Sequence, residues 1–124
     1  MVKLRYLDLL TKKYADKGRG PDNYDCWGLV IEMYRRSGRN IPDYESPATA
    51  DSDKNRWVQI HNPRIPGGRV IVVAIAPGGD GVVTHTGVIV DDGRFIHASE
   101  KKGIVIEPLG RYENFIEGYY EYAG

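Results

Sequence analysis

The chain opens with apolar residues at helical spacing. Leu4, Leu7, Leu10 and Tyr14 recur three or four positions apart, with lysine and aspartate between them. Because residues three and four apart share one face of an α-helix, this pattern predicts an amphipathic helix over residues 3–16. Residues 17–23 are rich in Gly, Pro, Asp and Asn, which predicts the loop that follows this helix.

A second helix is predicted from Asp25 or Cys26 to Arg36. Its apolar face consists of Leu29, Val30, Met33 and Tyr34. The two arginines at its end complement the negative end of the helix dipole, and Gly38 is a suitable stop. Residues 39–68 contain four prolines and predict an irregular segment that Trp57, Val58 and Ile60 anchor to the core.

The second half of the chain has the pattern of β-strands. Val70–Ile75 is a β-branched run, and Thr84–Val90 and Arg94–Ala98 flank an Asp-Asp-Gly turn typical of a hairpin. Gly103–Glu107 and Gly118–Tyr122 predict two more strands. Helices followed by an antiparallel meander indicate an α+β fold, and residues 1–124 suit one domain.

Composition narrows the functional classes. The chain has 124 residues, 41% hydrophobic and 27% charged, which is typical of a globular domain. Seventeen basic and seventeen acidic residues cancel, which argues against a nucleic-acid partner. The single cysteine excludes an internal disulfide and a Cys-based zinc cluster. The first residues contain no apolar run typical of a signal peptide or membrane span. We therefore expect cytoplasmic synthesis, with the protein staying there or leaving by another route, such as lysis or as part of a particle.

Cys26 is the first candidate for chemistry because it stands where the second helix begins. Unpaired amides and the helix dipole stabilise negative charge there, which favours a thiolate and can hold an oxyanion. The alternative is structural, since a cysteine beside Trp27 and Leu29 can be a small buried hydrophobe.

His85 and His97 lie on the two strands of the predicted hairpin. If Asp91 pairs with Arg94, opposed positions sum to 185, and His85 falls about three residues from the position opposite His97. A longer loop, or a bulge near Gly93, would bring the rings closer. Both rings can point to the same face, because side chains alternate with a period of two along a strand. A cysteine, a histidine and a further polar group form the usual arrangement of an activated thiol. The alternative to this catalytic interpretation is that both histidines are ordinary strand residues. A zinc site with two histidine ligands is a further possibility, but the sequence offers no third ligand at metal-like spacing.

Three segments resemble the NlpC family of papain-like peptidases, which cleave bacterial cell-wall peptides. Tyr24–Val30 (YDCWGLV) is similar to the family's Asp-Cys-Ser-Gly-Leu-Val signature. His85–Val90 (HTGVIV) resembles its His-Val-Gly-Ile-Tyr strand, and Phe95–Ser99 (FIHAS) resembles its Phe-Ile-His-Ala segment. The resemblance runs over residues 6 to 122 in the family's order.

The resemblance implies a papain-like NlpC fold, with N-terminal helices packed on a twisted antiparallel sheet, and no cofactor or metal. Cys26 corresponds to the nucleophile, His85 to the general base and His97 to the group that orients it. Tyr14 would line the site and serve the oxyanion or the substrate, although its place on the apolar stripe also suits a core role. The implied substrate is a peptidoglycan stem peptide, at a D-glutamyl–diamino-acid bond. Asp25 suits a helix cap or loop brace.

The chain also departs from the family pattern. Trp27 replaces the usual serine, which resembles the branch found in phage tail proteins, and Lys17 replaces the first glycine of the upstream loop. Gly68 replaces the aspartate of the family's Pro-Gly-Asp element. The rival hypothesis is a tail-assembly or structural component of the same fold with weak or no hydrolysis, bound to phage tail proteins. A related acyltransferase group places its histidine before its cysteine, and here Cys26 comes first.

Overall fold

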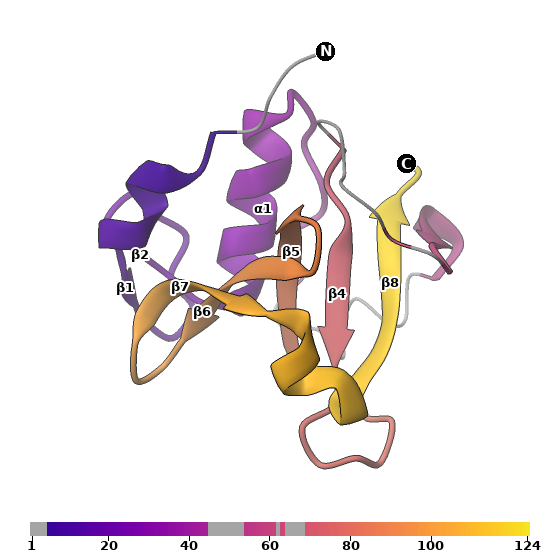
Figure 1. Cartoon of the computed structure of the whole chain (residues 1–124). Helices are drawn as coiled ribbons and strands as arrows, with labels where there is room; N and C mark the ends of the chain where they lie inside the picture. The colour runs from indigo at the N-terminus through magenta and orange to yellow at the C-terminus, as the bar shows by residue number, and fades with distance from the viewer. Residues whose placement is uncertain (1–4, 45–53, 62, 64–68) are drawn as a thin grey trace.

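A six-stranded antiparallel sheet with a helix packed against it forms the centre of the structure (Figure 1). The computed structural model describes residues 5–44, 54–61, 63 and 69–124. The strand order in the sheet is β3-β8-β4-β5-β6-β7. These strands are β3 (Trp57–Gln59), β4 (Val72–Ile75), β5 (His85–Asp91), β6 (Arg94–Ser99), β7 (Gly103–Pro108) and β8 (Ile116–Tyr122). The predicted α+β fold with a twisted antiparallel sheet is confirmed, and the β6–β7 hairpin runs across the direction of β4 and β8 (Figure 1).

Helix α1 (Cys26–Arg36) has the predicted bounds. Asp25 is its N-cap, and the carboxylate accepts a hydrogen bond of 2.6 Å from the amide of Gly28. The helix ends before Gly38, whose φ of 91° is a left-handed conformation that suits glycine. Its apolar face packs on β5 and β6, and the core between them contains Leu29, Val30, Met33, Val72, Val88, Ile96 and Ala98.

The prediction of a helix over residues 3–16 is wrong for the part that the structure describes. Residues Leu7–Thr11 form a short 3-10 helix, η1, and Lys13–Tyr14 form strand β1, which pairs in parallel with β2 (Asn23–Tyr24). The amide of Lys13 donates to the carbonyl of Asp22, so this backbone is paired with the following loop instead of continuing a helix. Residues 3 and 4 lie outside the described residues.

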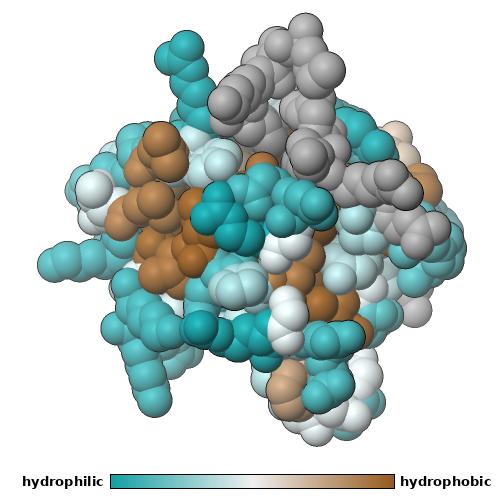
Figure 2. Space-filling model, in the orientation of Figure 1, coloured by the Kyte–Doolittle hydropathy of each residue, from teal (hydrophilic) through white to brown (hydrophobic). Residues whose placement is uncertain are grey.

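The expected apolar stripe is not buried either. Leu9 is fully buried, whereas Leu7 is 71% exposed and Leu10 is 39% exposed. Figure 2 shows apolar surface on the side of the molecule where η1 lies. A short helix needs a packed face to be stable in water, and this segment buries too few apolar side chains to extend one.

The five strands predicted in the second half of the chain are all present in the predicted order, with shifted ends. Strand β4 begins at Val72, two residues after its predicted start. Strand β8 begins at Ile116, two residues before its own predicted start. The sequence pattern missed β3, the 3-10 turn η2 (Lys54–Arg56) and the 3-10 helix η3 (Leu109–Phe115).

The two faces of the sheet have different partners. Helix α1 covers the face that carries Val72, Val88 and Ile96. On the other face, Val73, Ile75 and Phe95 form a second core with residues of η3 and β8, namely Leu109, Tyr112, Ile116 and Tyr119. Segment η3 therefore covers part of the face that is turned away from the helix.

Tyr34 ties the helix to the sheet through its hydroxyl. It donates to the carbonyl of Val70 at 2.7 Å and accepts from the amide of Tyr122 at 2.9 Å. Trp57 packs edge-on against the rings of Tyr34 and Tyr122, which confirms it as an anchor of its segment. Val58 does not anchor the segment, because it is 52% exposed.

We expect Gly28→Ala to destabilise the fold by about 1–3 kcal/mol. A methyl group at Gly28 would lie 2.0 Å from the carbonyl oxygen of Gly18, so the backbone of the loop or of the helix must move. Gly110→Ala is the control, because a methyl group there meets nothing within 4 Å; its effect should stay within about 0.5 kcal/mol. Urea unfolding measures both, and equal effects would contradict the close approach at Gly28.

Candidate active site

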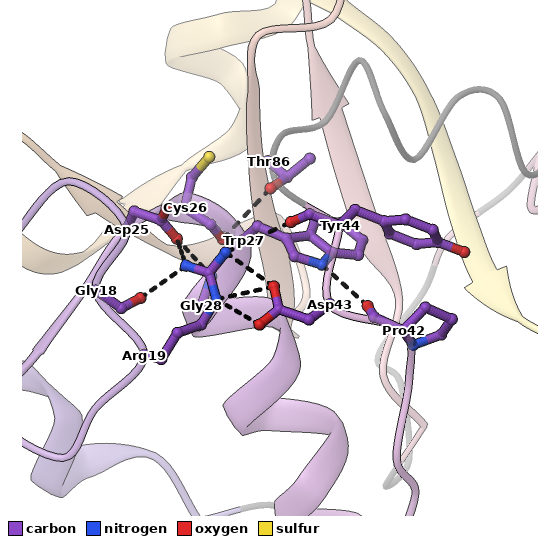
Figure 3. A network of polar contacts seen from close by, with 10 residues as sticks. All are labelled: Gly18, Arg19, Asp25, Cys26, Trp27, Gly28, Pro42, Asp43, Tyr44 and Thr86. Carbon is purple, nitrogen blue, oxygen red and sulfur yellow. Dashed lines mark hydrogen bonds and ion pairs between the residues drawn. The ribbon is translucent and has the colours of Figure 1, made fainter.

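Cys26 is the first residue of α1, as the sequence predicted, and a polar network fixes the backbone on either side of it. The guanidinium of Arg19 donates to the carboxylate of Asp25 at 2.7 Å and to that of Asp43 at 3.0 Å (Figure 3). The same group donates to the carbonyl of Gly18 at 2.9 Å. Asp25 is thus both helix cap and loop brace, which confirms the structural role expected for it.

The thiol of Cys26 points away from this network (Figure 3). Burial raises the pKa of the Cys26 thiol and the charge of Asp25 adds to this, while hydrogen bonding by Thr86 and by the backbone of Trp27 lowers the pKa. The pKa as a whole is raised. Burial thus outweighs the donors around the sulfur and works against the push towards thiolate that is expected at a helix N-terminus.

The register of the β5–β6 hairpin decides where the histidines lie. Asp91 pairs with Arg94 as predicted, but the register shifts between Ile89 and Asp91, and His97 is opposite Gly87. The predicted register would have placed His85 three residues from the position opposite His97, on the other face of the sheet. The bulge reduces this separation to two residues, so that both histidines share one face.

On that face the two rings are hydrogen-bonded to one another. The Nε2 atom of His85 lies 2.8 Å from the Nδ1 atom of His97. The expected proximity of the histidines is confirmed. His97 is 3% exposed, and its ring stacks on Phe95 at a centroid distance of 4.5 Å. Gly87 leaves room for this stack, because a methyl group there would lie 2.5 Å from the Phe95 ring.

Glu107 of β7 continues the chain of hydrogen bonds, and sequence reasoning missed it. Its Oε1 atom lies 2.7 Å from the Nε2 atom of His97. Because Phe95 is opposite Glu107, this carboxylate is a diagonal neighbour of His97 on the same face. The sequence did contain a signal. Glu107 alternates with Gly103 and Val105 along β7, so its side chain lies on the same face of the strand, and a carboxylate on a buried face needs donors or cations beside it.

The carboxylate of Glu107 is 7% exposed and has donors from three elements. Tyr112 of η3 donates to Oε1 at 3.0 Å, and Arg111 donates to Oε2 at 2.5 Å. Lys102, from the turn between β6 and β7, lies 3.5 Å from Oε2. Burial alone would raise the pKa of Glu107, but the hydrogen bonds from His97 and Tyr112 and the nearby positive charge hold it at about 2.

Both histidines are neutral at pH 7. Burial and the charge of a protonated His97 together lower the pKa of His85 to about 4, against the charge of Glu107, which raises it. Burial also lowers the pKa of His97, against the hydrogen bond and charge of Glu107, which raise it. With a neutral thiol at Cys26, the resting site has an uncharged thiol and an uncharged imidazole.

The N-terminus of α1 and the start of β5 are held together next to these groups. The hydroxyl of Thr86, the residue after His85, donates to the carbonyl of Cys26 at 3.4 Å. Tyr14 lies on β1 and is half-buried. Burial raises the pKa of Tyr14, and the charges of Glu100 and of an ionised Cys26 raise it too, so its hydroxyl lies within electrostatic range of the thiol.

Two absences concern only the residues that the structure describes. Among them, no group of three or more His, Cys, Asp and Glu side chains is placed to hold a metal ion. In the same part of the chain, no helix is long and apolar enough to cross a membrane.

Acid should destabilise the fold from near-neutral pH downward. The pKa of His85 is about 4 in the folded protein and 6.5 ordinarily. As the pH falls through this window, the unfolded chain binds a proton that the folded protein does not, so stability is lost. His97 acts in the same direction. Glu107 extends this loss of stability from pH 4.5 down to about pH 2. Its carboxyl has an ordinary pKa of 4.5 in the unfolded chain and a pKa of about 2 in the folded protein, so the unfolded chain takes up the proton first.

We expect His85→Asn to flatten the dependence of Tm on pH between pH 6.5 and 4. His61→Asn is the matched control, because His61 is exposed and should leave the dependence as it is. Thermal unfolding followed by circular dichroism at several pH values measures both. A wild-type slope in His85→Asn would show that this histidine titrates normally in the folded protein.

Comparison with known proteins gives the family and the fold of this chain. The family model described as NlpC/P60 family matches residues 11–121. No curated protein matches the chain. The NlpC2 structure from Trichomonas vaginalis is 27% identical, with a TM-score of 0.71, and the match covers 93% of this chain and 42% of that one.

Two further structures show the same fold at lower identity. An NlpC/P60 family protein from Bacillus cereus is 21% identical with a TM-score of 0.72, over 94% of this chain and 37% of that one. The NlpC/p60 domain of the peptidoglycan hydrolase SagA is 15% identical with a TM-score of 0.63, over 92% and 89% of the two chains. The chain thus spans less than half the length of the Trichomonas and Bacillus proteins. Because the family model covers nearly the whole chain, the protein belongs to the NlpC/P60 family.

Proposed function

We propose that this protein is a cysteine peptidase that hydrolyses peptidoglycan stem peptides through a thioester intermediate. The observation that carries the proposal is the hydrogen-bonded pair of His85 and His97, 2.8 Å apart, beside a helix N-terminus that begins with Cys26. Membership of the family and the printed function of SagA, a peptidoglycan hydrolase, support the substrate class.

In this mechanism Cys26 is the nucleophile and His85 is the general base. The resting pair is neutral, so the thiol proton moves to His85 as the sulfur attacks the carbonyl carbon. The imidazolium then gives this proton to the leaving amine, and water releases the acyl group from sulfur. His97 orients the base through its contact with Nε2 of His85.

Asp25 occupies the amide of Gly28, so the amides that precede Gly28 in α1 are the ones that suit an oxyanion next to Cys26. Tyr14 lies within electrostatic range of the thiol, which supports its proposed role as a group that lines the site and binds oxyanion or substrate. We propose the D-glutamyl–diamino-acid bond as the bond that is cleaved.

We also propose that the enzyme works in association with a phage tail. The support is Trp27, which stands where the family usually has serine. In the structure Trp27 is 2% exposed, donates to the carbonyl of Pro42 at 3.3 Å and packs against Tyr44. Trp27 therefore packs the segment around Pro42 and Tyr44 against the start of α1, and it does not itself form a docking surface.

We expect Cys26→Ala to reduce cleavage of peptidoglycan fragments by about 10,000-fold or more, because no other group can form the thioester. Purified wild-type protein and the variant are incubated with the fragments, and mass spectrometry of the products identifies the bond. His61→Asn is the control and should cleave as the wild type does, since the exposed His61 is remote in the sequence from every site segment. Cleavage by Cys26→Ala at the wild-type rate would disprove the mechanism. A folded wild-type protein that cleaves nothing would favour a structural tail component.

A further inference from the structure

The three groups of the hydrogen-bonded chain come from three consecutive strands and form a diagonal across one face of the sheet. His97 on β6 is opposite Gly87 on β5 and Val105 on β7. His85 precedes Gly87 by two residues, and Glu107 follows Val105 by two. Side chains two residues apart share a face, so the three groups step across the sheet in one direction.

The donors around Glu107 determine its charge. Its Oε2 atom accepts a hydrogen bond from Arg111 at 2.5 Å, and the ammonium of Lys102 lies 3.5 Å from the same atom. Both cations can donate hydrogen bonds but cannot accept them. Its Oε1 atom receives the hydroxyl of Tyr112. A carboxylate surrounded by such donors is ionised, and an ionised carboxylate can only accept.

This charge fixes the position of each proton along the chain. The Nε2 atom of His97 must donate to Glu107, so the Nδ1 atom of neutral His97 is an acceptor. The Nε2 atom of His85 must then donate to that acceptor. The Nδ1 atom of neutral His85 is consequently left as the acceptor, which is the form that a base for the thiol requires.

We propose that Glu107 is a positioning residue that sets the tautomers of both histidines, so that Nδ1 of His85 is free to accept the Cys26 proton. The inference rests on the proposed function for its catalytic meaning. In the reaction the proton moves from Sγ to Nδ1 of His85, which leaves a thiolate and an imidazolium. The protons on Nε2 of His85 and Nε2 of His97 stay where they are, and Glu107 stabilises the new positive charge without taking a proton.

The tautomers can be measured on the wild-type protein. The chain has three histidines, and long-range ¹H–¹⁵N correlation spectra at pH 7 separate the two ring nitrogens of each. We expect His85 and His97 both to carry their proton on Nε2, with exposed His61 as the internal reference. A proton on Nδ1 of His97, or a mixture of tautomers at either buried ring, would overturn the inference.

The reactivity of the thiol gives a second measurement that needs no peptide substrate. Cys26 is the single cysteine, so its alkylation by iodoacetamide is read without ambiguity. In Glu107→Gln the charge that favours the imidazolium is lost, and the amide can also donate to His97. We expect alkylation at pH 7 to slow roughly tenfold, the equivalent of one pKa unit, and the pH profile to move upward.

Glu113→Gln is the matched control, because Glu113 is an exposed glutamate of η3 and undergoes the same chemical change. It should keep the wild-type profile. The other charged or titratable groups near the hydrogen-bonded chain of His85, His97 and Glu107 are Lys102, Arg111 and Tyr112. Asp25 and Tyr14 influence the thiol. All five residues are kept in both variants. A wild-type profile in Glu107→Gln would overturn the inference. If Glu107→Gln does not fold, Tyr112→Phe removes one donor, and the wild-type spectra decide the question.

The two proposals can fail separately. The expected tautomers and alkylation rates, with no cleavage of stem peptides, would support the role of Glu107 and count against the peptidase. Cleavage by the wild type, with an unaltered thiol profile in Glu107→Gln, would support the peptidase and remove Glu107 from the mechanism.

Discussion

Side chains alternate along a β-strand, so the bulge between Ile89 and Asp91 sets the face on which the residues before it lie. Without the extra residue, His85 and His97 would lie on opposite faces of the sheet. With it, Thr86 and Val88 face α1 while His85 faces the second core. The same register shift therefore serves both the packing of the helix and the pairing of the histidines.

The site is built from two polar networks on different elements. Arg19, Asp25 and Asp43 fix the loop and the start of α1, and so fix the backbone of Cys26. Glu107 and its donors fix the two histidines. The contact between Thr86 and the carbonyl of Cys26 joins the halves, and the apolar packing of α1 on β5 holds them in register. A change in one network can thus alter the geometry of the site without disrupting the other.

Much of this could be predicted from the sequence. Helix α1 was identified correctly because its cap, apolar face and glycine stop all agree, and the β5–β6 hairpin because Asp92-Gly93 is a strong turn signal. The N-terminal segment was not identified correctly. Its apolar residues have helical spacing, but its backbone pairs with residues 22–24, and no local pattern reveals this pairing. Lys17 shows the same limit: it has a φ of 60° in a position where the family usually has glycine, and the loop imposes that conformation on it.

Strand alternation alone could place Glu107 on a buried face but not beside the histidines, because that position depends on two registers at once, those of β5–β6 and β6–β7. A buried carboxylate is costly unless cations and donors surround it. Here Arg111 and Tyr112 of η3 provide them, from the element that also covers Val73, Ile75 and Phe95. The segment that closes the second core is therefore also the one that keeps the carboxylate ionised. Packing on the side of the sheet away from α1 thus supports the charge that, in the proposed mechanism, sets the tautomer of His85 as the base for Cys26 at the N-terminus of α1.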